Sequence, residues 1–126
     1  MTKLLLIISL LTPAALMGAD KKLAEKGKAL YTAKTCNTCH GMDGIKPLAP
    51  MYPSLAGKDK ACLTKQFNDI VKAKRQGGMV ALMLANPMVK SVKPDELAAI
   101  TEWVSSLDAA KGIQEPKTTA CKVAKK

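Results

Sequence analysis

The feature that most constrains this chain is the pentapeptide Cys36-Asn37-Thr38-Cys39-His40. Two cysteines separated by two residues and followed at once by a histidine form the pattern to which haem is attached covalently. The two thiols can add to the two vinyl groups on one porphyrin edge, and the next side chain can then reach the iron. We therefore expect Cys36 and Cys39 to be the thioether attachment points, His40 to be the proximal iron ligand, and the chain to enclose one covalently bound haem.

The composition agrees with a core built around a cofactor. The 126 residues are enough for one domain at most, and they include only one Trp, one Phe and two Tyr. So few aromatic side chains leave the core short of apolar volume, and a haem would supply that volume. A structural zinc site made by the motif and one further cysteine has enough ligands, although the adjacency of Cys39 and His40 is awkward for tetrahedral closure.

The N-terminus has the organisation of a secretory signal peptide. A short positive region ends at Lys3, residues 4–11 are almost continuously aliphatic, and small residues at 17–19 offer a cleavage site after Ala19. The apolar run is shorter than the roughly 20 residues that a membrane span needs. We expect residues 1–19 to be removed on export to the periplasm, which leaves a mature protein without a membrane span and with a net charge of +9, since only Lys3 is lost from +10.

Two cysteines remain outside the motif. In an oxidising compartment Cys62 and Cys121 are candidates for a disulfide, and the alternative is two free thiols. Such a bond would close a long loop, which the chain-entropy treatment values at roughly 4 kcal/mol. Residues 111–126 form a basic tail without helical periodicity, which this bond would tie down.

Periodicity and capping signals predict an all-α chain with three main helices and connecting loops. Apolar residues recur with helical spacing over about 20–34, 59–76 and 94–108, and no strand candidate is visible. Asp59 is a suitable N-cap for the second helix, and Gly77 and Gly78 are expected to end it. Residues 79–91, rich in Met and Ala, are expected to be a loop.

These patterns together resemble the small class I bacterial cytochromes c. The similarity rests on Cys-x-x-Cys-His-Gly at 36–41, Ala-Pro-x-Tyr-Pro-x-Leu-Ala-Gly at 49–57, Leu-x-Lys-Gln-Phe at 63–67 and Pro-Asp-Glu-Leu-x-x-Ile-x-x-Trp-Val at 94–104. The resemblance covers about residues 20–107, and we expect a single cytochrome c domain over residues 20–110. It also implies that the first and last helices cross at Gly27, Tyr31 and Trp103, that the carbonyl of Pro50 accepts a hydrogen bond from His40, and that Tyr52 lies at the cofactor.

The second axial ligand is expected to be a methionine. His40 is the only histidine, so a second histidine in this chain is excluded, and a thioether is the usual partner in proteins similar to this one. Met79, Met83 and Met88 lie in the expected loop. We favour Met83 as the distal ligand, with Met88 as the alternative and Met79 third, because Met83 has loop on both sides of it.

A haem with both axial positions filled has no open site for a substrate. We therefore expect a non-enzymatic, monomeric one-electron carrier that binds acidic redox-partner proteins through its excess of lysines. Two alternatives are a permanent cytochrome subunit of a periplasmic dehydrogenase or reductase complex and, in a different class, a five-coordinate haem enzyme or sensor. No nucleic-acid-binding motif accompanies the basic charge, so nucleic acid is not expected as a partner.

Overall fold

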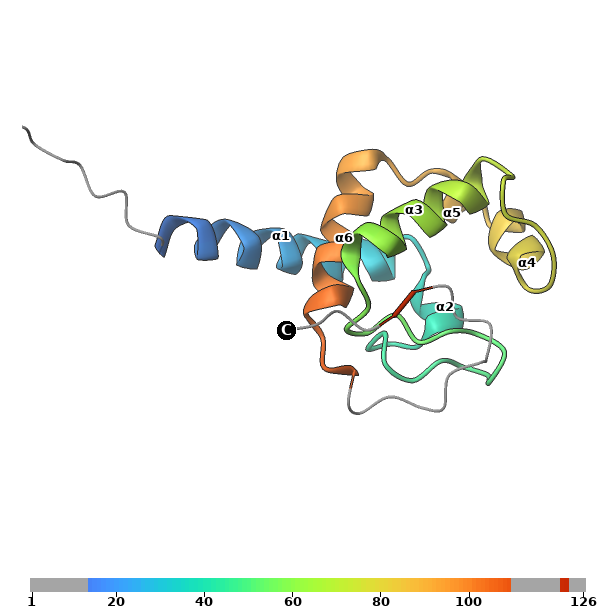
Figure 1. Cartoon of the computed structure of the whole chain (residues 1–126), viewed down its shortest axis with the longest axis horizontal. Helices are drawn as coiled ribbons and strands as arrows, with labels where there is room; N and C mark the ends of the chain where they lie inside the picture. Colours follow the sequence, from blue (N-terminus) through green and yellow to red (C-terminus); the bar gives the residue numbers. More distant parts are fainter. Residues whose placement is uncertain (1–13, 110–120, 123–126) are drawn as a thin grey trace, which may run out of the picture.

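A computed structural model describes residues 14–109 and 121–122 of the chain. Every regular element in this part is a helix, which confirms the expected all-α fold. The helices are α1 (Ala14–Ala33), α2 (Asn37–His40), α3 (Lys60–Val71), α4 (Val80–Ala85), α5 (Pro87–Lys90) and α6 (Pro94–Ser106). Helices α1 and α6 cross each other, α3 runs beside them, and α4 lies at the end of the molecule remote from the start of α1 (Figure 1).

The predicted signal peptide is only partly visible. Residues 1–13 lie outside the described residues, and α1 runs without interruption from Ala14 through the expected cleavage point after Ala19. Cleavage at that point therefore stays a prediction. No helix among the described residues has both the length and the apolar composition to cross a membrane.

The crossing of α1 and α6 forms the centre of the core. A Cβ built on Gly27 would lie 1.9 Å from the carbonyl oxygen of Ala99, so only glycine permits this approach. One turn later, the rings of Tyr31 and Trp103 pack edge to face with their centroids 4.8 Å apart. Ile100 and Val104 of α6 complete this buried cluster. The expected crossing at Gly27, Tyr31 and Trp103 is thus present.

The second helix starts where the sequence indicated and ends earlier. The Asp59 carboxylate accepts a hydrogen bond from the Cys62 backbone N–H at 2.8 Å, as expected of an N-cap. We expected α3 to continue to about residue 76, and this was wrong, because it ends at Val71. Ala73 adopts a left-handed conformation with φ of 55°, and the Lys74 N–H donates back to the Asp69 carbonyl in a Schellman arrangement.

The segment expected to be a loop, residues 79–91, instead contains two short helices. Helix α4 carries Met83, and α5 begins after Asn86, whose side chain accepts a hydrogen bond from the Met88 N–H at 2.9 Å. Pro87 follows this cap at the first helical position, where its missing N–H costs nothing. Asn86 also donates from Nδ2 to Oγ1 of Thr35 at 2.7 Å, which fixes the turn between the two helices next to the cysteine motif.

Candidate functional site

The Cys-x-x-Cys-His motif forms one helical turn directly after α1. The His40 N–H donates to the Cys36 carbonyl at 3.0 Å, and the Cys36 N–H donates to the Tyr31 carbonyl at the same distance, so the end of α1 positions the turn. Cys36 and Cys39 are free thiols, three residues apart and therefore on the same side of the turn. Burial raises the pKa of the unattached Cys36 thiol to about 11.

His40 is held in one orientation by a backbone carbonyl. Its Nδ1 lies 2.9 Å from the carbonyl oxygen of Pro53. A carbonyl can only accept a hydrogen bond, so Nδ1 carries the proton and Nε2 keeps its lone pair available for a metal. Burial lowers the pKa of His40, an effect that the Pro53 carbonyl partly opposes, and this favours the neutral ring that a metal requires.

The acceptor was expected to be Pro50, and the structure corrects this to Pro53. The Tyr52 N–H donates to the Ala49 carbonyl at 3.0 Å, so residues 49–52 form a turn with Pro50 at its second position. Pro50 is exposed on this turn, whereas Pro53 follows it and lies against the imidazole. Tyr52 is half-buried and lines the same cavity as His40.

The residue after the motif allows the chain to turn back across the histidine. Gly41 has φ of 88°, and a Cβ there would lie 1.9 Å from the Lys46 carbonyl oxygen. Its own carbonyl accepts a hydrogen bond from the hydroxyl of Tyr31 at 2.8 Å. Burial raises the pKa of Tyr31, so this hydroxyl keeps its proton and remains a donor. The α1–α6 core and the motif are therefore mechanically linked through Tyr31.

A cavity of about 680 Å³ lies next to the motif. This volume falls within the roughly 300–1,000 Å³ that is usual for sites of drug-sized ligands and cofactors. Cys36, Cys39 and His40 all line it. Its apolar walls come from two helices, with α3 and α6 contributing Leu63, Phe67, Ile70, Leu97, Ile100 and Val104.

The methionines divide clearly by position. Met79 and Met83 both line the cavity, and so does Met51 in the loop that carries Pro53. Met88 is not among the residues that line it and is 40% exposed on α5. Met42, immediately beyond the motif, is 73% exposed. Of Met83 and Met88, only Met83 lines the same cavity as His40.

Three lining residues were not anticipated from the sequence. Lys58 is buried in the cavity wall, and Arg75 donates to the side-chain oxygen of Gln66, also in the wall, at 2.9 Å. Periodicity could not find Lys58 or Arg75, because both lie in non-helical segments. A lysine also normally indicates a solvent-exposed position.

The cysteines outside the motif pair with each other. Cys62 and Cys121 form the expected disulfide, with their Cα atoms 5.7 Å apart. Neither can then complete a zinc site with the motif, and the described residues contain no cluster of three or more His, Cys, Asp or Glu side chains able to hold a metal. Of the remaining tail, residues 111–120 and 123–126 lie outside the described residues.

The residues present fit a covalently bound haem. Two free thiols lie one turn apart, an imidazole has its Nε2 available, and both border an apolar cavity of suitable size. The zinc alternative lacks its fourth ligand. The structure thus agrees with the chemistry that the motif indicated.

Comparison with known proteins points to the same group. Residues 24–108 match the family described as cytochrome c. Cytochrome c4 of Pseudomonas aeruginosa is 30% identical over 115 residues, covering 91% of this chain and 54% of that protein. Cytochrome c-554(548) of Halomonas halodenitrificans is 38% identical over 72 residues, covering 57% of this chain and 83% of that protein.

A third relative is described by its role. The thiosulfate dehydrogenase electron acceptor of Stutzerimonas stutzeri is 27% identical over 103 residues, which cover 76% of this chain and 45% of that protein. The chain spans about half the length of this relative and of cytochrome c4. The family match nevertheless includes the cysteine motif, the cavity helices and the α1–α6 crossing. The chain belongs to the cytochrome c family and carries covalently bound haem c.

Proposed function

We propose that this protein is a periplasmic one-electron carrier whose haem is attached at Cys36 and Cys39 and ligated by His40 and Met83. The observation that carries the proposal is that Met83, from α4, lines the same cavity as His40, from α2. The predicted signal peptide would deliver the chain to the periplasm, where the Cys62–Cys121 disulfide can form.

The haem supplies an iron that changes between its ferric and ferrous states, and the protein sets how readily it does so. The Pro53 carbonyl fixes the ring of His40 and makes Nε2 a better electron donor. The apolar side chains that α3 and α6 contribute to the cavity would limit the access of water to a bound haem. A thioether from Met83 would favour the ferrous state and leave no position open for a substrate.

The choice of Met83 over the other two candidates rests on where each side chain lies. Met88 is on α5, 40% exposed and outside the cavity lining. Met79 lines the cavity but precedes α4, directly after Gly77 and Gly78. Met83 lies within α4, whose last turn is held near the cysteine motif by the bond from Asn86 to Thr35. A helix held in this way positions a ligand more firmly than a loop does.

Replacing each methionine tests the ligand directly. Met83→Ala should abolish the long-wavelength charge-transfer band that a Met–Fe(III) bond gives and should lower the reduction potential, since the thioether favours ferrous iron. Met88→Ala is the matched control, because it removes the same side chain outside the cavity, and it should keep the band. If Met83→Ala keeps the band and Met79→Ala or Met88→Ala loses it, the assignment of Met83 is wrong.

The charge of the protein supports acidic redox partners. The chain has 20 basic and 10 acidic side chains, and such an excess attracts acidic surfaces at long range. One relative is described as the electron acceptor of thiosulfate dehydrogenase, which supports exchange of electrons with another protein. Stopped-flow association with an acidic redox protein should slow steeply as ionic strength rises. A rate that does not change with salt would refute electrostatic steering.

The alternative is a permanent subunit of a dehydrogenase or reductase complex. The same relative supports this alternative, because it is described as the electron acceptor of a dehydrogenase. Size-exclusion chromatography of protein from its native source distinguishes the two. A free carrier elutes as a monomer, whereas a subunit elutes with its enzyme. A five-coordinate haem enzyme or sensor would instead bind carbon monoxide rapidly when reduced, and we expect slow or no binding.

A further inference from the structure

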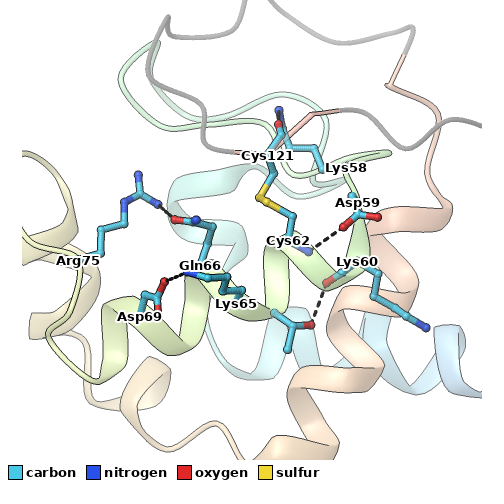
Figure 2. The surroundings of a disulfide bond; sticks show 10 residues. Lys58, Asp59, Lys60, Cys62, Lys65, Gln66, Asp69, Arg75 and Cys121 are labelled. Carbon is cyan, nitrogen blue, oxygen red and sulfur yellow. Dashed lines mark hydrogen bonds and ion pairs between the residues drawn. A yellow bond between two sulfur atoms is a disulfide. The ribbon is translucent and has the colours of Figure 1, made fainter.

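Cys121 and Lys122, which we call the Cys121 segment, lie against residues 58 and 59 just before α3. Cys121 is joined to Cys62 by the disulfide, and its carbonyl accepts a hydrogen bond from Nζ of Lys58 at 3.1 Å (Figure 2). The next residue, Lys122, accepts from the Asp59 N–H at 3.1 Å. Cys121 is only 5% exposed. One covalent bond and two hydrogen bonds therefore hold this short segment in place.

Lys58 is an unusual side chain to find at this position. It is 1% exposed and is one of the three largest fully buried side chains among the described residues. Burying an ammonium costs several kcal/mol unless hydrogen bonds replace its lost water. The Cys121 carbonyl is one such replacement. The buried lysine and the Cys121 segment thus stabilise each other, because displacing the segment would remove an acceptor from a buried donor.

Both residues also border the cofactor cavity. Lys58 and Cys121 line the same cavity as Cys36, His40 and Met83. The disulfide joins Cys121 to the first turn of α3, the helix whose apolar face forms another wall. Cys121 therefore forms part of the cavity wall beside α3.

We propose that the Cys121 segment is a wall of the haem site that keeps water from the cofactor, and that Lys58 and the disulfide are positioning residues for this wall. Ferric haem carries one more positive charge than ferrous haem, so excluding water disfavours the ferric state. The wall therefore raises the reduction potential. The proposal rests on the proposed electron-carrier function, but it does not depend on which methionine binds the iron.

Redox titration of the haem-loaded Cys62→Ser/Cys121→Ser protein tests the wall. We expect an at least threefold fall in the ratio of ferrous to ferric haem at a fixed applied potential, which corresponds to about 28 mV for a one-electron couple. Glu96→Gln is the control for general destabilisation, because Glu96 forms an ion pair with Lys34 outside the cavity lining, and its potential should match that of the wild type. An unchanged potential in the double variant would make the disulfide a stabiliser only and would overturn the proposal.

Lys58→Met tests the positioning role separately, because methionine keeps most of the apolar stem and removes the donor. In the wild-type background it should lower the potential. In the Cys62→Ser/Cys121→Ser background it should change the potential little, since the segment that Lys58 holds is already released. A full, additive shift in both backgrounds would show that Lys58 acts through its own charge and would refute its role through Cys121.

The charge-transfer band separates this proposal from the ligand assignment. We expect the band to persist in the cysteine and lysine variants while the potential falls. A fall in potential that accompanies loss of the band would mean that the segment acts on the iron ligand, and the proposed wall would be wrong. If no methionine binds the iron, the band is absent from the wild type, and that result contradicts the ligation without testing the wall.

Discussion

Gly27 is a position at which the packing of two helices depends on the absence of a single atom. A Cβ there would lie 1.9 Å from the Ala99 carbonyl oxygen and 3.0 Å from the Cβ of Trp103. To reach an ordinary contact of 3.4 Å, α6 would have to move away from α1 by about 1.5 Å. The obstacle is backbone, so rotation of a side chain cannot relieve it. We therefore expect Gly27→Ala to separate the two helices.

Three contributions set the change in the free energy of unfolding that Gly27→Ala causes. Overpacking at a rigid contact costs about 1–3 kcal/mol. Loss of the edge-to-face pair between Tyr31 and Trp103 adds about 0.5–1.5 kcal/mol. The better helix propensity of alanine returns about 1 kcal/mol. We expect Gly27→Ala to lower the free energy of unfolding by about 2 kcal/mol, although the same change would stabilise an isolated helix.

Guanidinium unfolding of the ferric, haem-loaded protein measures this free energy. Lys28→Ala is the matched control, because Lys28 is the next residue of α1 and is exposed, and its effect should stay within about 0.5 kcal/mol. A Gly27→Ala protein as stable as the wild type, or more stable, would refute the close contact between α1 and α6.

Two further predictions concern the disulfide and an ion pair. Cys62→Ser/Cys121→Ser opens a loop with a sequence separation of 59, so the free energy of unfolding should fall by about 4 kcal/mol in the same denaturant assay; a loss near zero would contradict this. Hydrogen bonding from the Lys93 N–H and the nearby Lys34 ammonium lower the pKa of Glu96 below its ordinary value. The contribution of ionised Glu96 to the free energy of unfolding is therefore complete above its ordinary pKa of 4.5 and is lost as the pH falls through the folded-state pKa. Glu96→Gln should destabilise the protein at pH 7 and progressively less below pH 4.5. A stability difference that does not change with pH would refute the pairing.

The parts of the fold that could be predicted from the sequence are those in which the residue type determines the geometry. Gly27 and Tyr31 lie one turn apart on α1, and a glycine in a helix is favoured where another helix approaches closely. The resemblance to the class I cytochromes c implied that Trp103 of the last helix meets them. Asp59 before an apolar stripe indicated the start of α3, and two cysteines outside the motif, in a chain with a predicted signal peptide, indicated the disulfide. In each case a local rule and the tertiary structure agree.

The errors arose where the geometry did not depend on a characteristic residue. Helix α3 ends at Val71 and is followed by a left-handed Ala73, a position where glycine is usual, so the glycines at 77 and 78 gave a misleading boundary. Helix α4 is a single short element without a cap of its own, which periodicity cannot separate from a loop. The choice between the carbonyls of Pro50 and Pro53 depends on the turn at residues 49–52, and sequence spacing cannot resolve it.

The central claim, a haem attached covalently through the cysteine motif, is tested most directly by one extraction. Treating the purified, coloured protein with acidified acetone dissolves haem that is held only by ligation and packing, and leaves covalently attached haem with the precipitated chain. We predict that the haem absorbance stays with the protein, and that it moves to the solvent in a Cys36→Ala/Cys39→Ala variant that retains any colour. Complete transfer of the colour from the wild-type protein to the solvent would contradict the account.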